Sequence, residues 1–309
     1  LPMVDGTAAK PFVFRTLVPS TIGAVASSID AATAARLQAA FAPAMSRLFR
    51  IDYSLEALIA LPLMFGCLVA VPFVLRRLAR AMLPGSPLQE DVAPAVAMLF
   101  LPVLFLYNHY VYDPATLLLF SVASLLLARG RFMAFHAVFL LAAFNKETSV
   151  LLIPVFLLAA WGSMRRGALV AHLSALSLIW LGVKAYVSTR FAANDGAFME
   201  FHLFDHNLAL LDHPLALAYF LGAAALIALV ALPGWRSAPA LARHGFLMII
   251  GTQAVMALFF GYVDELRQYY EAMPFLFVLG LGSLRALHGR TRNGARGDSA
   301  QESPSRTAR

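Results

Sequence analysis

The chain contains 309 residues, of which 60% are hydrophobic and 13% are charged, and its formal net charge is +7. Because soluble globular domains are about 25% charged, this composition excludes a soluble domain and indicates a helical protein that crosses the membrane several times. The positive charge does not indicate nucleic-acid binding, since much of it lies in short turns and in the C-terminal tail, where anionic lipid attracts it. The single cysteine, Cys67, excludes an intrachain disulfide.

Residues 1–54 form the longest stretch that tolerates polar side chains, and we expect them to be a first outer loop. The second half is rich in alanine, with larger apolar residues at helical spacing, so one or two helices should lie along the membrane surface. Asp30 can cap the start of such a helix, whereas Pro43 should interrupt it. The chain begins at Leu1 without a methionine, which is consistent with the loss of an initial helix.

Nine apolar stretches follow, and they predict an all-α polytopic membrane domain over residues 55–287 with about nine transmembrane helices. A straight span needs about 20 apolar residues, so five stretches qualify or nearly do, while the second to the fifth are short. Residues 288–309 are rich in Arg, Gly and Ser, and we expect a disordered cytoplasmic tail there. The stretches are 55–75, 92–106, 114–128, 132–144, 149–162, 168–187, 215–232, 246–262 and 270–286.

The turns between these stretches alternate in charge. Cytoplasmic loops collect Lys and Arg, so we expect the basic turns and the tail to lie in the cytoplasm. The polar clusters that alternate with them would then share the outer face, where they can converge on one site. The basic turns lie at 76–80, 129–131, 165–166 and 236–243, and the outer clusters lie at 5–15, 107–113, 145–148, 194–213 and 264–271.

Residues 132–162 allow two interpretations. One long helix would place Asn145, Lys146 and Glu147 in the middle of the membrane and would put neighbouring basic turns on opposite sides. Two short helices would form a hairpin with the sequence NKET at its outer tip. We favour the hairpin, because every basic turn then lies on the cytoplasmic side. Helices this short must end below the outer surface, so their polar tips would lie in a water-filled depression.

The outer clusters also have structural explanations. Tyr112 can belong to an aromatic belt at the membrane interface, and Asp113, which precedes a proline, can cap the start of a helix. Lys146 and Glu147 are harder to explain in this way, because ionisable groups at a membrane are costly unless they are paired or hydrated. They can pair with each other or with Arg267, or they can act on a substrate.

Five segments of the chain carry a resemblance to known proteins: KPFVFRTLVP (10–19), YDPATLLLF (112–120), RGR (129–131), AAFNKETSVLLIPVFLL (142–158) and DELRQYYEAMP (264–274). They resemble a group of bacterial multispanning proteins that is similar to the GT-C superfamily of membrane glycosyltransferases. The resemblance implies a GT-C-like fold in the bacterial inner membrane and transfer of a sugar from a polyprenyl-phosphate donor on the periplasmic face. It also implies an acidic residue early in the first outer loop, which here is Asp5, although the chain has no obvious acidic pair there.

Glycosyl transfer from a lipid phosphate needs a carboxylate that takes the proton of the acceptor and cations or hydrogen-bond donors that hold the departing phosphate. We predict that Asp5 is the base and that Lys146 and Arg267 hold the phosphate. Glu147 would hold the cations in place or bind the sugar. The candidate catalytic residues are Asp5, Glu147 and Asp264, and the candidate substrate-binding residues are Arg15, Tyr112, Asp113, Asn145, Lys146, Glu265, Arg267 and Tyr270.

The expected partners are a polyprenyl-phosphate-linked sugar, a periplasmic or lipid-linked acceptor and membrane lipid. The sequence carries no glycine loop for phosphate and no HExxH motif, and we expect no cofactor. A divalent metal is the minor alternative, because His202 and His206 lie four residues apart beside Glu200 and Asp205, although no zinc signature matches this group.

Two other classes of protein stay open. A transporter or flippase would use the charges of the pairs Lys146/Glu147 and Asp264/Arg267 for coupling or gating, but the chain lacks the repeated halves that such proteins show. A non-catalytic assembly subunit would use the same residues as structural ion pairs.

Overall fold

The computed structural model describes residues 1–48, 54–85, 87–104 and 110–301, and the regular elements in these ranges are all helices. By length and composition five helices within these ranges can cross a membrane, which is the helical membrane architecture that the composition predicts. They are α3 (Leu55–Met82), α9 (Arg166–Arg190), α10 (Pro214–Ala231), α11 (Ala240–Phe260) and the segment Leu266–Leu287, which joins η5 (Leu266–Ala272) to the start of α12 (Met273–Gln301).

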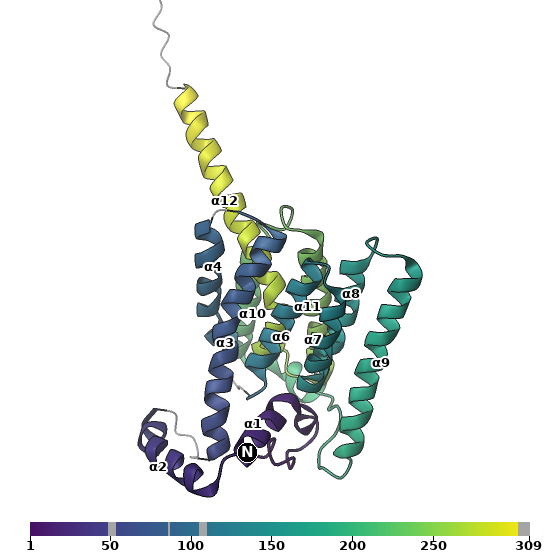
Figure 1. The fold of residues 1–309 in the computed structure, drawn as a ribbon. Helices are drawn as coiled ribbons and strands as arrows, with labels where there is room; N and C mark the ends of the chain where they lie inside the picture. Colours follow the sequence, from purple (N-terminus) through teal and green to yellow (C-terminus); the bar gives the residue numbers. More distant parts are fainter. Residues whose placement is uncertain (49–53, 86, 105–109, 302–309) are drawn as a thin grey trace, which may run out of the picture.

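The other apolar stretches are shorter helices that pack among the long ones (Figure 1). The most central is α6 (Asp113–Ala128), which lies against α3 and buries most of its side chains. At about 1.5 Å per residue, these helices are shorter than the ~30 Å hydrocarbon core, so nine spans stays a prediction. The others are α4 (Pro87–Leu99), α5 (Leu101–Leu104), α7 (Phe132–Asn145), the 3-10 turn η2 (Glu147–Leu151) and α8 (Leu152–Ala160).

The segment from α7 to α8 is a hairpin, which confirms the interpretation that we favoured. Lys146 has an extended backbone, with φ −159° and ψ 139°, and it separates α7 from η2. The two arms lie side by side, since the ring of Phe132 at the start of α7 packs 5.2 Å from the ring of Phe156 in α8. The sequence NKET therefore forms the tip of the hairpin.

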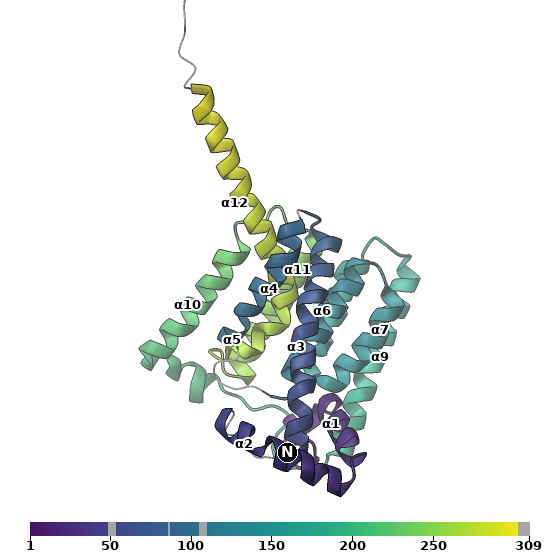
Figure 2. The same cartoon turned by 60° about the vertical axis from the view of Figure 1, so that its left-hand side comes forward.

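Residues 1–48 lie at one end of the bundle, opposite the end from which α12 projects (Figures 1 and 2). They form η1 (Phe12–Phe14), α1 (Leu17–Ser27) and α2 (Ala31–Leu48). Asp30 caps α2 as predicted, because its carboxylate accepts a hydrogen bond of 3.0 Å from the amide of Thr33. The predicted interruption at Pro43 is wrong: α2 continues through it, since a proline removes only one helical hydrogen bond and the adjacent turns keep theirs.

A second loop, residues 191–213, packs against the first at this end of the molecule. The backbone amide of Lys10 donates a hydrogen bond of 2.8 Å to the carbonyl of Asp195. Next to this contact Gly196 has φ +91°, and a Cβ atom there would lie 2.6 Å from the carbonyl oxygen of Lys10, so the close approach requires glycine. The loop contains η3 (Leu203–Asn207) and η4 (Ala209–Asp212).

Helix α12 extends beyond the point at which we expected it to end. It reaches Gln301, whereas the sequence predicts a disordered tail from residue 288. The first turns of α12 are fixed in the bundle, and adding residues to an existing helix avoids the unfavourable step of forming a new nucleus. The rest of the predicted tail, residues 302–309, lies outside the described residues.

The basic turns gather at the end of the bundle from which α12 projects. Arg285 of α12 donates hydrogen bonds to the carbonyls of Leu83 and Pro84, which follow the basic end of α3. Ser283 of α12 accepts a hydrogen bond from the amide of Gly234, which lies two residues before Arg236. The spatial separation of the basic turns from residues 1–48 fits the predicted alternation, while the side of the membrane on which each end lies stays a prediction.

The predicted sidedness can be measured with two single-cysteine variants made in a Cys67→Ser background. Ala193→Cys lies in the second loop and Ser163→Cys lies between α8 and α9, and both positions are exposed. We expect a membrane-impermeant maleimide to label position 193 in intact cells with a permeabilised outer membrane, and position 163 only after the inner membrane is lysed. The reverse pattern would contradict the predicted orientation.

Candidate functional site

The predicted site residues converge where the start of α6, the tip of the α7–α8 hairpin and η5 meet the segment after η1. Hydrogen bonds and ion pairs connect most of them into one group, which we call the charged cluster. Its members that the sequence predicted are Arg15, Tyr112, Asp113, Asn145, Lys146, Glu147, Glu265, Arg267 and Tyr270. The structure adds Glu271 and the residues that bind its carboxylate.

Lys146 pairs with Glu271 in the interior of the protein. The distance from Lys146 Nζ to Glu271 Oε1 is 2.7 Å, and the two side chains are 8% and 0% exposed. Thr148 donates a hydrogen bond of 2.6 Å to the same oxygen, and Gln253 donates to the other. Three side chains therefore bind the carboxylate of Glu271, two from the tip of the hairpin and one from α11. These contacts connect η5 to both elements.

Glu147 pairs with Arg15 and not with its sequence neighbour. Two nitrogens of the Arg15 guanidinium donate to the two carboxylate oxygens, at 2.7 and 3.3 Å, and Arg15 also donates to the hydroxyl of Tyr112. Pairing between Lys146 and Glu147, which the sequence allowed, does not occur in the structure. The reason is the extended backbone at Lys146, which directs successive side chains to opposite sides.

Burial alone would lower the pKa of Arg15, but the attraction of the Glu147 carboxylate outweighs it, and the pKa is raised above its usual value. Arg15 therefore stays charged at every physiological pH. The Glu147 side chain is 27% exposed, more than its partner at 10%, so its carboxylate is the part of this pair that solvent or a ligand can reach.

Asp113 contributes a third carboxylate to the charged cluster, after those of Glu271 and Glu147. Its carboxylate accepts hydrogen bonds of 2.9 Å from the hydroxyl of Tyr270 and from the amide of Tyr110, and Arg267 lies 3.5 Å away. Arg267 also donates two hydrogen bonds to Glu265, at 2.7 and 3.0 Å. The predicted helix-capping role of Asp113 is wrong, since Asp113 is the first residue of α6 and its side chain binds the preceding turn.

Three further predicted residues are buried and serve the cluster as connectors. The side-chain amide of Asn145 donates to the carbonyl of Tyr112 and to the hydroxyl of Thr116, at 3.1 and 2.7 Å, and thereby ties α7 to the start of α6. The rings of Tyr112 and Tyr270 are fully buried. Their predicted role in binding a substrate stays a prediction, and it would require the cluster to open.

Asp5 lies at the same end of the bundle but outside the charged cluster. Its side chain is 57% exposed, and its carboxylate lies 3.2 Å from the α-amino group of Leu1. The adjacent residue, Val4, packs in a small apolar group that contains Tyr112, which places the Asp5 backbone near the cluster. The Asp5 carboxylate is therefore open to water.

Asp264 is also separate from the cluster, since it binds the second loop. Its carboxylate lies 2.8 Å from Nε2 of His206, and the ring of Tyr262 packs against the same histidine. His202 contacts Asp205 at 2.9 Å and Glu200 at 3.4 Å. Within the described part of the chain, no group of three or more His, Cys, Asp or Glu side chains is arranged to hold a metal ion.

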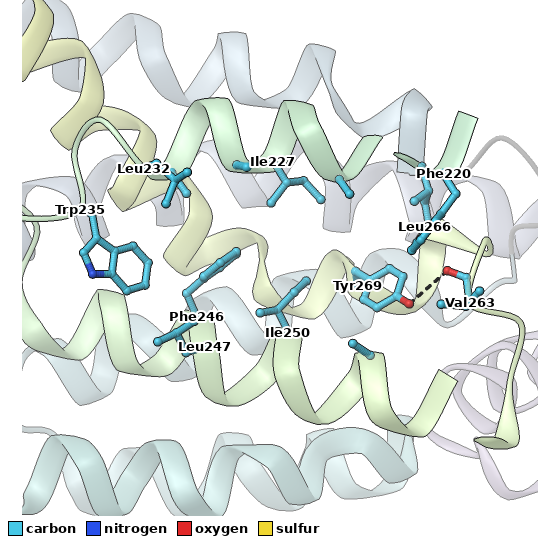
Figure 3. Close-up of a pocket in the computed structure, with 14 residues that line it drawn as sticks. Phe220, Ile227, Leu232, Trp235, Phe246, Leu247, Ile250, Val263, Leu266 and Tyr269 are labelled. Atoms are coloured by element: carbon cyan, nitrogen blue, oxygen red, sulfur yellow. Dashed lines mark hydrogen bonds between the residues drawn. The ribbon is translucent and has the colours of Figure 1, made fainter. Parts of the chain in front are cut away.

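An apolar groove with a volume of about 450 Å³ runs between α10 and α11 (Figure 3). Trp235 lies at one end, and Val263, Leu266 and Tyr269 lie at the other. The hydroxyl of Tyr269 donates a hydrogen bond of 3.1 Å to the carbonyl of Val263. Because Arg267 is the next residue after Leu266, this end of the groove adjoins the charged cluster.

The sequence analysis missed Glu271 and the groove. Glu271 belongs to the polar segment 264–271, and an ionisable residue in such a segment near the membrane was a usable signal. The groove has no signal in the sequence, because its lining residues resemble any lipid-facing residues and only the packing of α10 and α11 on α12 brings them together.

Comparison with known proteins finds no matching family model, no similar curated protein and no similar solved structure. The fold and the site together define a helical membrane protein with a buried charged cluster at one end of its bundle and an apolar groove that ends beside it.

Proposed function

We propose that this protein is a membrane glycosyltransferase that moves a sugar from a polyprenyl-phosphate donor to a periplasmic or lipid-linked acceptor. The observation that carries the proposal is the position of the apolar groove, which adjoins the charged cluster at Leu266 and Arg267. A lipid-linked donor needs both surfaces, since its chain requires apolar contact and its phosphate requires cations or hydrogen-bond donors. In the proposed orientation this end faces the periplasm of a bacterial inner membrane.

In the proposed reaction a hydroxyl of the acceptor attacks the anomeric carbon of the donor sugar. The bond between this carbon and the phosphate oxygen breaks, and the electron pair leaves with the lipid phosphate. The hydroxyl proton passes to a carboxylate, for which we propose Asp5, because its side chain is exposed and its neighbour Val4 packs in the apolar group that contains Tyr112. Glu147 would keep Arg15 in place, and Asp264 would position the second loop.

Lys146 and Arg267 remain our proposed contacts to the departing phosphate, together with the Tyr270 hydroxyl. Each cation already has a carboxylate partner, Glu271 for Lys146 and Glu265 for Arg267. A phosphate would therefore have to share the cation with this partner, and Arg267 can do so because its guanidinium carries five N–H donors.

A non-catalytic assembly subunit is the second candidate, and the pairing itself favours it. Each of the three cations contacts at least one carboxylate: Arg15, Lys146 and Arg267. The charged cluster therefore also fits a protein in which these ion pairs only hold three elements of the fold together. The two proposals differ in whether the protein binds and converts a lipid-linked sugar.

Filling the groove should impair the use of long lipid donors. Ala224 of α10 lines the groove, and Ala224→Trp would occupy the space that we assign to the lipid chain. If only two CH₂ groups of the lipid chain lose their buried position, the affinity for the lipid falls about tenfold. We therefore expect the KM for a long polyprenyl-phosphate sugar to rise at least that much. A geranyl-phosphate sugar should lose less, because its chain fills less of the groove.

The matched control is Ala225→Trp, which adds the same side chain at the next exposed position of α10. We expect this variant to retain the wild-type KM for both donors. Equal effects of the two substitutions, or equal effects on long and short donors, would count against the groove as the lipid site.

A further inference from the structure

The second loop carries a row of exposed apolar side chains that belongs neither to the charged cluster nor to the groove. Its members are spaced three, four, three and four residues apart, so the helical turns of η3, η4 and the start of α10 place them along one face. They are strongly exposed, since Phe204 is 71% and Leu215 is 85% accessible to solvent. We call this row the apolar stripe, and its residues are Phe201, Phe204, Leu208, Leu211 and Leu215.

One flank of the apolar stripe is fixed to the end of α11. Asn207 and Leu210 on this flank are buried. The side-chain amide of Asn207 donates hydrogen bonds to three carbonyls at the end of α11, and its oxygen accepts one of 2.9 Å from the amide of Val263. The fold therefore sets the direction in which the stripe faces. The three carbonyls are those of Ala257, Leu258 and Gly261, at 3.0, 2.8 and 2.8 Å.

The other flank of the apolar stripe is polar. Glu200 and Asp205 are exposed there, and His202 lies 3.4 Å from the first carboxylate and 2.9 Å from the second. The loop is thus amphipathic, with an apolar row between charged side chains on one side and the protein on the other. Amphipathic turns of this kind bind in the plane of a membrane interface, and an exposed apolar patch with a polar rim marks a contact surface.

The course of the apolar stripe favours the lipid bilayer over another protein as the partner. The stripe runs from the loop into α10, a helix long and apolar enough to cross a membrane, where Leu221 continues the exposed apolar surface. Figure 2 shows α10 at the edge of the bundle. In the loop, η3 packs on α11 and η4 packs on α10, so the stripe lies at the level at which both helices end.

We infer that the apolar stripe inserts into the bilayer, in the leaflet at the end of the bundle that carries residues 1–48. Its partner is the boundary between the headgroups and the acyl chains, and the burial of apolar surface drives the contact. The inference does not depend on sugar transfer, but it bears on the groove. Val263 lines the groove and binds Asn207, so an inserted loop would hold this end of the groove at a depth from which a lipid can enter sideways.

The test measures the depth of single nitroxide labels, attached to cysteines in a Cys67→Ser background, in the full chain reconstituted in phosphatidylcholine vesicles. Phe204→Cys and Leu211→Cys report on the apolar stripe, and neither removes a core contact, because both side chains are exposed. Asp205→Cys is the matched control on the polar flank, and Leu221→Cys is the control within the hydrocarbon core. Collisions with oxygen, which concentrates in hydrocarbon, are compared with collisions with a water-soluble nickel chelate.

We expect the labels at positions 204 and 211 to lie about 5–10 Å below the headgroup boundary. Their ratio of oxygen to nickel collisions should exceed that of position 205 and fall below that of position 221.

A ratio at positions 204 and 211 equal to that at position 205 would overturn the inference, because the stripe would then face water. Labels shielded from both reagents would also overturn it and would indicate a protein partner, such as a second copy of the chain. An inserted stripe in a protein that transfers no sugar would keep this membrane contact and remove only the proposed function.

Discussion

Lys146→Met is expected to lower the free energy of unfolding by about 3–5 kcal/mol, because it leaves the carboxylate of Glu271 without its cation in the protein interior. Glu271 is 0% exposed, and its remaining partners, Thr148 and Gln253, are neutral hydrogen-bond donors that cannot compensate a full charge. Unfolding in mixed detergent micelles measures the loss directly.

A second substitution should restore most of this stability. Lys146→Met with Glu271→Gln removes both charges, and the new amide can still accept the hydrogen bond of Thr148. The matched control is Lys146→Met with Glu147→Gln, which changes the sequence neighbour. This control should not be rescued, because Glu147 pairs with Arg15 and its loss strands a second charge. Rescue by the Glu147 change and none by the Glu271 change would contradict the pairing in the structure.

The Lys146/Glu271 double variant also separates the two candidate functions. If Lys146 contacts the departing phosphate, the folded double variant should bind a polyprenyl phosphate more weakly than the wild type. If Lys146 is only a structural partner of Glu271, the double variant should bind the lipid as the wild type does.

Asp5→Asn is expected to lower the rate of sugar transfer about a hundred- to ten-thousand-fold, the usual contribution of a general base. Asparagine keeps the size and hydrogen-bonding capacity of aspartate but cannot take the proton of the acceptor. The free energy of unfolding should stay within about 0.5 kcal/mol of the wild-type value, since the side chain is 57% exposed. Initial rates with saturating donor give the effect on chemistry.

Asp195→Asn is the control for Asp5→Asn, because Asp195 is an exposed acid in the loop that packs against the same segment. We expect this variant to retain the wild-type rate. A wild-type rate in Asp5→Asn would remove Asp5 from the mechanism and leave Glu147 and Asp264 as the candidate bases.

Much of the architecture follows from local sequence features. The long apolar runs predict α3, α9, α10 and α11, and the polar sequence NKET correctly marks a break between two short helices. These features are local, since the apolar length of a segment and its interruption by charged residues depend on neighbours in the chain.

The ion pairs of the site could not be predicted, because their partners are distant in the sequence. Lys146 and Glu147 are adjacent, yet they pair with Glu271 and Arg15, which come from opposite ends of the chain. Which of several carboxylates meets a given cation depends on helix packing and on the extended backbone at one residue. For the same reason the sequence grouped Asp264 with the cluster, whereas the structure pairs it with His206.

The measurement that tests the central claim most directly is an in vitro transfer assay with the purified full chain, a radiolabelled polyprenyl-phosphate sugar and a mixture of periplasmic and lipid-linked acceptors. We expect labelled sugar to move from the donor to an acceptor in the wild-type protein and to move far more slowly in the Asp5→Asn variant. Folded protein that binds the lipid but transfers no sugar to any acceptor, and releases none to water, would contradict the claim that this protein is a glycosyltransferase.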